Sequence, residues 1–142
     1  MIEPGGRSIS PDGRHEAELS YAGEIPFGRA YFTLRIDSRC FADRIFGHGA
    51  LWSPDNSILV VTEWHTIDRE RGPITSLLLI RPNDWTYSRF PILNKGFALS
   101  NYFVGHSMVL RHTDEIFLGG RFKTERETNL AMIDDWKPIT AN

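Results

Sequence analysis

The clearest hydrophobic pattern lies in the middle of the chain, where short apolar runs are separated by turn residues. Residues 58–64 and 75–81 are rich in β-branched and large apolar side chains, which predicts two strands. Residues 86–90 alternate polar and aromatic positions, and this period of two predicts a third strand with one exposed face. The same order occurs earlier in the chain and predicts three more strands, over 15–21, 31–37 and 40–46.

The last third of the chain has a weaker pattern. Residues 115–118 and 129–133 are predicted as strands on either side of a glycine turn and a charged loop. Apolar residues spaced three apart also fit a short helix over 124–136, and residues 94–102 are a second candidate for a helical turn. The alignment with the middle of the chain favours a strand for 129–133.

A turn motif recurs ahead of the predicted strands. Ser10-Pro11-Asp12-Gly13 and Trp52-Ser53-Pro54-Asp55 place their aspartates 43 residues apart. Proline presets φ, aspartate accepts hydrogen bonds from nearby backbone amides, and glycine tolerates positive φ, so each motif is predicted to join two strands. A degenerate third copy is predicted at residues 112–115. We therefore expect one domain over residues 1–142, built from three degenerate repeats at about 8–50, 51–104 and 105–140.

These turn sequences, placed before apolar strands at a period in the low forties, resemble the blades of TolB-type, WD40-like β-propellers. The resemblance implies successive antiparallel meanders of three or four strands, with a usual role as a rigid protein-binding platform rather than a catalyst. Propellers typically close with four to eight blades, so three repeats cannot complete a ring. We expect the sheets to pack as a β-sandwich-like arrangement or a partial propeller. Association of two chains through an exposed edge is a further possibility.

Length and composition exclude several classes of protein. The 142 residues support one apolar core, and 41% apolar with 24% charged residues predicts a folded chain. The formal net charge of −2 gives no strong field to attract nucleic acid or an anionic membrane. No Gly-x-Ser-x-Gly elbow, Gly-x-Gly-x-x-Gly loop, Walker loop or Cys-x-x-Cys pair is present, and no cofactor or metal is expected.

The cysteine content predicts a reducing, cytoplasmic location. Cys40 is the only cysteine, so it cannot form an intramolecular disulfide, whereas secreted domains of this size often depend on several. The first residues contain no basic stretch followed by an apolar run, so no secretory signal is expected. Apolar runs such as 77–80 are far shorter than the roughly 20 residues of a membrane-spanning helix. Cys40 itself is expected to be a half-buried apolar side chain rather than a reactive thiol.

Four residues are candidates for catalysis or metal binding. Glu63 and His65 are two apart on a predicted strand, so they project from one face, with Trp64 on the other. With His48 or His106 they would form an acid–base pair or a metal site. The alternative is that Glu63 and His65 mark a solvated strand end. Each of the other two histidines follows a glycine at an equivalent place in its repeat, which favours a structural role such as a bond to a turn aspartate.

Charged loops and aromatic residues form a candidate binding surface. Two mixed-charge segments are predicted as loops at corresponding positions of the second and third repeats. Such loops can steer an encounter with a complementary protein, and aromatic residues often anchor an interface. The aromatic residues Trp85, Trp136 and Tyr102 would extend this surface, although several aromatic residues are needed in the core. The residues expected to bind a partner are Asp68, Arg69, Glu70, Arg71, Lys123, Glu125, Arg126, Trp64 and Tyr87.

Three functions are compatible with these patterns. The first is a small cytoplasmic protein that masks a partner protein, for example an immunity protein that blocks a toxin. The second is a small hydrolase or lyase that uses Glu63, His65 and one of His48 and His106. The third is a propeller-fragment scaffold that assembles as a homodimer by edge pairing. No nucleic-acid or membrane partner is expected.

Overall fold

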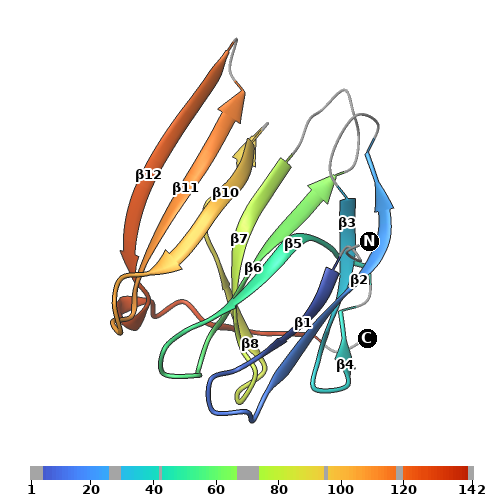
Figure 1. Ribbon diagram of the computed structural model, residues 1–142, viewed down its shortest axis with the longest axis vertical. Helices are drawn as coiled ribbons and strands as arrows, with labels where there is room; N and C mark the ends of the chain where they lie inside the picture. The colour runs from blue at the N-terminus through green and yellow to red at the C-terminus, as the bar shows by residue number, and fades with distance from the viewer. Residues whose placement is uncertain are drawn as a thin grey trace.

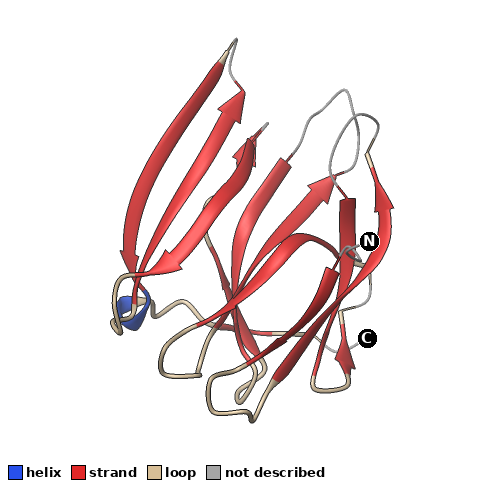
Figure 2. Cartoon of the chain, viewed as in Figure 1, coloured by secondary structure: helices blue, strands red, loops and turns tan. Residues whose placement is uncertain are grey.

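The chain is an antiparallel all-β protein, as the sequence predicts. The computed structural model describes residues 5–25, 30–41, 43–66, 74–94, 96–117 and 120–140. In these ranges the strand pairings are antiparallel, and one short 3-10 helix, η1 (Leu130–Met132), accompanies the strands (Figures 1 and 2). Within them we find no helix long and apolar enough to cross a membrane.

The strands form three meanders that follow one another along the chain (Figure 1). The first contains β1 (Gly5–Ile9), β2 (Glu16–Glu24) and β3 (Ala30–Ile36), with the short β4 (Arg39–Cys40) paired to β3. The second contains β5 (Ile45–Trp52), β6 (Leu59–Thr66), β7 (Ile74–Arg81) and β8 (Thr86–Arg89), with β9 (Leu93–Asn94) paired to β7. The third contains β10 (Gly96–Phe103), β11 (Val109–Phe117) and β12 (Arg121–Asn129).

The end of the chain returns to the second meander. After η1, the short strand β13 (Lys137–Pro138) pairs with β8. The first two meanders and β13 form one ten-stranded sheet, and β10–β11–β12 form a separate three-stranded sheet. The first two meanders are joined in this sheet where β3 meets β5, through the pair Phe32 with Phe46.

Two apolar cores form on the opposite faces of β6 and β7. The first core lies between the first and second meanders and contains Leu34, Ile36, Phe46, Leu59, Leu78 and Ile80 among its buried side chains. The second lies between the second and third meanders and contains Ile58, Val60, Leu77, Leu79, Leu110 and Leu130. Alternate residues of β6 and β7 therefore point into different cores, which explains why both strands are apolar at nearly every position. Figure 1 shows β6 and β7 between the other two meanders.

The two Ser-Pro-Asp turns have the same hydrogen bonds, as the repeated sequence predicts. Ser53 Oγ donates to Asp55 Oδ1 at 2.7 Å and accepts from the Ile58 amide at 3.0 Å. Ser10 Oγ donates to Asp12 and accepts from the His15 amide in the same way, at 2.7 and 3.1 Å. The fourth position has positive φ in both turns, at Gly13 (76°) and Asn56 (69°). Each turn joins two neighbouring antiparallel strands, β1 to β2 and β5 to β6.

The third turn is not where the sequence suggests. Residues 112–115 lie inside β11 and form no turn. The equivalent turn begins at Val104, whose amide donates to the Val109 carbonyl, just as the Ser53 amide donates to the Ile58 carbonyl. It contains Gly105 at φ 59° and has neither proline nor aspartate, so composition does not mark it.

Several other expectations differ from the structure. Residues 40–46 are not one strand, because the chain turns at Asp43, with φ 58°, before β5 begins. Cys40 is exposed rather than half-buried, because β4 is a two-residue strand beside the end of β3. The predicted strand 129–133 and the helix 124–136 are replaced by a strand to Asn129 followed by η1. Residue 94 and residues 96–102 are in strands rather than in a helical turn.

Substitution of Ser53 tests the turn geometry, because the Ser53 side chain is fully buried. Replacing it with alanine leaves the buried Ile58 amide without its acceptor. We expect Ser53→Ala to lower the free energy of unfolding by about 1–3 kcal/mol. Urea unfolding measures the loss, and Ser100→Ala, on the exposed part of β10, is the control, with a change within about 0.5 kcal/mol. Equal stabilities of the two variants would contradict the role assigned to Ser53.

Candidate functional site

Glu63 and His65 lie on one face of β6, as predicted, but Glu63 is held in a buried ion cluster. Arg89 Nε and Nη2 donate to Glu63 Oε1 at 3.0 and 2.7 Å, and Arg44 Nη1 lies 3.8 Å from Oε2. Glu63 is 5% exposed, and both guanidinium groups lie over the ring of Tyr87 at 5.6 and 5.4 Å. Since its carboxylate is neutralised by two arginines, Glu63 is placed to support the fold rather than to accept a proton from a substrate.

His65 is engaged with the neighbouring strand. Its Nε2 lies 2.8 Å from Ser76 Oγ on β7. Burial lowers the pKa of His65 below its ordinary value, because it penalises the charged imidazolium; the Glu63 carboxylate opposes this shift, and Arg89 and Arg44 add to it. The imidazole therefore loses its proton more readily than a histidine with the ordinary pKa.

The structure does not bring His48 and His106 together with this pair. His48 is exposed on β5 and packs against the ring of Phe32, with ring centroids 5.9 Å apart. His106 is exposed in the β10–β11 turn, at the opposite end of the strands from His65 (Figure 1). Within the described ranges we find no cluster of three or more histidine, cysteine or acidic side chains able to hold a metal ion.

A histidine does bond an aspartate in a turn, but it is a different histidine. His15 Nδ1 lies 2.6 Å from Asp37 Oδ2, and Nε2 lies 3.0 Å from Asn83 Oδ1. The His15 ring also stacks on Trp52, with centroids 5.8 Å apart. Asp37 follows β3 of the first meander, whereas Trp52 ends β5 and Asn83 follows β7 of the second. His15 therefore links the first meander to the second.

The residues expected to bind a partner lie in different places. Trp64 is 5% exposed and lies in the interior, so its ring is not available as a surface anchor. Tyr87 is half-buried under the two arginines described above. Lys123, Glu125 and Arg126 lie on strand β12 rather than in a loop. The other four, Asp68, Arg69, Glu70 and Arg71, lie outside the described residues.

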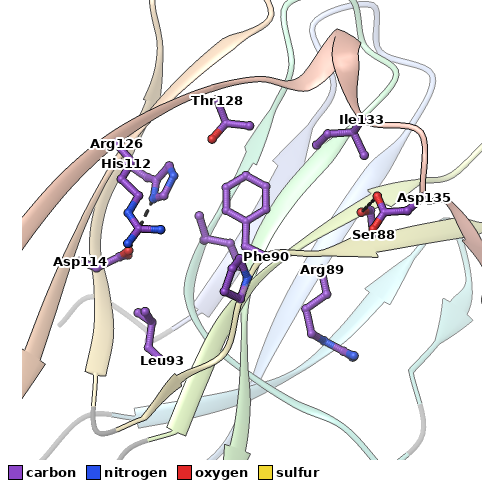
Figure 3. A pocket seen from close by; sticks show the side chains of 12 residues that line it. Ser88, Arg89, Phe90, Leu93, His112, Asp114, Arg126, Thr128, Ile133 and Asp135 are labelled. Carbon is purple, nitrogen blue, oxygen red and sulfur yellow. Dashed lines mark hydrogen bonds and ion pairs between the residues drawn. The ribbon is translucent and has the colours of Figure 1, made fainter.

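A pocket opens between β7–β8 and the inner face of the three-stranded sheet (Figure 3). Its volume is about 230 Å³. One wall is apolar and contains Leu77, Phe90, Pro91, Leu93 and Ile133. The other wall is polar and contains His112, Asp114, Arg126 and Thr128, with Ser88 and Asp135 at one side. A pocket with an apolar body and a few convergent polar groups is the common form of a binding site.

His112 and Asp114 are the central polar groups of this pocket. They are 4% and 6% exposed, and His112 Nδ1 lies 3.6 Å from Asp114 Oδ2, too far for a good hydrogen bond. Both ring nitrogens of His112 are buried, and no group of the described chain hydrogen-bonds to them. The ring also lies 5.1 Å from that of Phe90, centroid to centroid, at the edge of the apolar wall.

Other polar atoms on the same face also lack partners. Asn101, on β10, lies opposite His112, and Thr124, on β12, lies opposite Asp114. Both residues therefore lie beside the dyad. Asn101 Oδ1 and Thr124 Oγ1 are buried and without a hydrogen bond. Each buried polar group left unpaired costs about 1–3 kcal/mol. In contrast, Ser88 Oγ donates to Asp135 Oδ1 at 2.8 Å, so this side of the pocket is satisfied internally.

Sequence reasoning missed His112, Asp114, Ser88 and Asp135 and found only Arg126. The segment 112–115 resembles a turn, whereas it is a strand whose alternate residues face the pocket. The signal that could have found the dyad is the period of two, which places Leu110, His112 and Asp114 on one face.

Comparison of the chain with protein-family models, with curated proteins and with solved structures gave no significant match. The function therefore has to be argued from the site itself.

The Glu63 cluster predicts a strong effect on stability. Glu63→Gln keeps the size of the side chain but leaves two arginines, each about a quarter exposed, without their counter-charge. We expect a loss of about 2–4 kcal/mol in the free energy of unfolding. The control is Glu127→Gln, which breaks the exposed ion pair with Arg111 and is expected to cost about 1 kcal/mol or less. Comparable losses in the two variants, measured in urea, would show that the Glu63 cluster is not the buried support described here.

The lowered pKa of His65 predicts a pH dependence. Between the folded pKa and the ordinary value near 6.5, the unfolded chain binds more protons than the folded chain, so folding stability falls as pH decreases through this window. His65→Gln removes the titration and retains a hydrogen-bonding group for Ser76. We expect the variant to lose less stability than the wild type between about pH 7 and pH 5. Urea unfolding across this range measures the slopes, and parallel slopes would contradict the assignment.

Proposed function

We propose that the chain is a non-enzymatic protein-binding domain, which uses the pocket between β7–β8 and the three-stranded sheet to anchor a partner protein. The observation that carries this proposal is the buried His112–Asp114 dyad, whose imidazole has no hydrogen-bond partner in the described chain. Stability alone would favour apolar residues at these positions, since an apolar replacement removes the desolvation cost. A functional role explains why the chain keeps polar groups that reduce its stability.

The chemistry of the pocket favours an aromatic side chain with a hydroxyl group as the occupant. A volume of about 230 Å³ suits one large side chain rather than a drug-sized ligand. Leu77, Phe90 and Leu93 would contact the ring, and a hydroxyl can both donate and accept a hydrogen bond beside His112 and Asp114. Tyrosine combines these properties and is common among the residues that anchor protein interfaces.

The architecture supports a binding role. The resemblance to TolB-type repeats implies a rigid protein-binding platform, and two cores shared between three meanders provide a stiff support for the pocket. Glu63 and His65 are engaged by Arg89, Arg44 and Ser76, so we assign no catalysis to them. We propose a cytoplasmic location, in which the exposed Cys40 would stay reduced. An immunity-type inhibitor that masks a toxin is a protein of this class.

Co-expression with the product of the neighbouring gene tests this function. We expect the two proteins to copurify, and we expect His112→Phe, which keeps an aromatic ring of similar size but removes both ring nitrogens, to weaken the complex at least about tenfold by calorimetry. His106→Phe is the matched control, because the same substitution is made at an exposed histidine outside the pocket. p-Cresol, which carries the tyrosine side chain, should compete with the partner.

Two results would overturn the proposal. One is that no co-encoded protein binds the chain. The other is that His112→Phe and His106→Phe, both folded by circular dichroism, bind the partner equally well.

A further inference from the structure

Strand β12 is a long, exposed edge strand. It spans Arg121–Asn129 and, within the described part of the chain, pairs only with β11, at the outside of the three-stranded sheet (Figure 1). Seven of its nine residues are exposed, including residues on both faces. The unpaired backbone groups of such an edge can pair with another strand. The side chains of β6 and β7 are mostly buried, whereas those of β12 are mostly exposed.

The charges on the outer face of β12 are arranged in two blocks. Arg121 and Lys123 are followed by Glu125 and Glu127, and the strand period of two places all four on the same face. Their order along the strand is positive, positive, negative, negative. This order is complementary to itself when a second identical strand runs in the opposite direction.

One antiparallel register matches every one of these charges. With a twofold axis through Thr124, Lys123 of one copy lies opposite Glu125 of the other, and Arg121 lies opposite Glu127. Opposite charges directly across an antiparallel pair are stabilising, and like charges are destabilising. Shifting the register by two residues places Glu125 opposite Glu125, so the charges also select the alignment.

We propose that a second copy of this chain pairs with β12, so that the two three-stranded sheets join as one continuous sheet across a twofold axis. The symmetric contact uses the same patch on both copies, which is the usual form of a homodimer interface. The central contacts between Lys123 of one copy and Glu125 of the other are the ones by which the two strands recognise each other. Glu127 binds Arg111 within its own sheet, and Glu125 lies 4.0 Å from the same guanidinium, with its side chain 62% exposed and accessible to a second copy.

The opposite face of β12 supports the same register. Phe122 is 56% exposed, which is unusual for a large apolar side chain. In the twofold register it lies opposite Arg126 of the second copy, and a guanidinium over an aromatic ring is a favourable contact. Thr124 lies opposite itself, and threonine pairs are favourable in antiparallel sheets.

The dimer and the pocket share Arg126 but are tested at different residues. Lys123 and Glu125 lie on the outer face of the sheet, whereas the dyad His112–Asp114 lies on the inner face. Substitution of the two outer residues therefore leaves the pocket-lining side chains in place. Loss of the dimer and loss of partner binding can be measured independently.

Reciprocal charge reversal tests the proposal. Lys123→Glu alone places Glu opposite Glu125, and Glu125→Lys alone places Lys opposite Lys123. By sedimentation velocity, we expect the wild-type chain to form a concentration-dependent dimer and each variant to dimerise at least about tenfold more weakly. An equimolar mixture of the two variants restores opposite charges at both positions, so we expect a heterodimer. Lys137→Glu, the same substitution on the edge strand β13, is the control and should dimerise like the wild type.

Salt provides a second measurement that needs no variant. Because the contact is made by exposed ion pairs, raising the salt concentration should weaken the wild-type dimer. The proposal is overturned if the wild-type chain is monomeric up to about 100 μM, a concentration at which a weak specific dimer would be detected. It is also overturned if the dimer is unaffected by both reversals, or if mixing the two variants fails to restore it.

Discussion

The burial of β6 and β7 on both faces is the constraint on which the rest of the structure depends. Leu59 and Leu78 pack toward the first meander, whereas Val60 and Leu79 pack toward the third. Fully burying one such side chain contributes about 1.5–3 kcal/mol, so these two strands stabilise both flanking meanders. The first and third meanders contribute to different cores and are held together through the second. The end of the chain strengthens this arrangement, because β13 leaves the third meander and pairs with β8.

The pocket follows from a change of residue type along one face of β11. Leu110 is fully buried in the second core, and the next residues on that face, His112 and Asp114, are polar. Apolar side chains pack closely against β7, but an imidazole and a carboxylate lose hydration there without gaining a partner. The other buried charge of the molecule is different, because Glu63 is bonded by Arg89 and lies near Arg44. Glu63 has two counter-ions within the fold, whereas both ring nitrogens of His112 remain for a group that enters the pocket.

The sequence predicts the parts of the fold that depend on local signals. Ser53 and Asp55 form the predicted turn because the tetrapeptide itself supplies the donors and acceptors. Strands β6 and β7 are predicted because two-sided burial leaves a dense apolar run. In contrast, β12 was expected to be a charged loop, because an edge strand exposed on both faces has no hydrophobic period. The dyad was also missed, because its burial depends on the path of a neighbouring sheet, which no local pattern encodes. The same holds for Trp64, whose environment is set by the pairing of β6 rather than by its own residue type.

The third meander thus differs from the other two in the origin of its stability. The buried apolar part of its inner face lies near η1, where Leu110 and Leu130 join the second core, and its outer edge has no neighbouring strand among the described residues. Charged residues on an edge strand often prevent pairing, and a run of one sign does so most effectively, because any second copy brings like charges together. Strand β12 instead separates its charges into a positive and a negative block, with Thr124 between them. In one antiparallel register all four charges lie opposite a charge of the other sign, whereas a shift of two residues brings like charges together at the twofold axis. The edge is therefore protected against indiscriminate aggregation while remaining open to an identical strand, and both properties follow from the same four side chains.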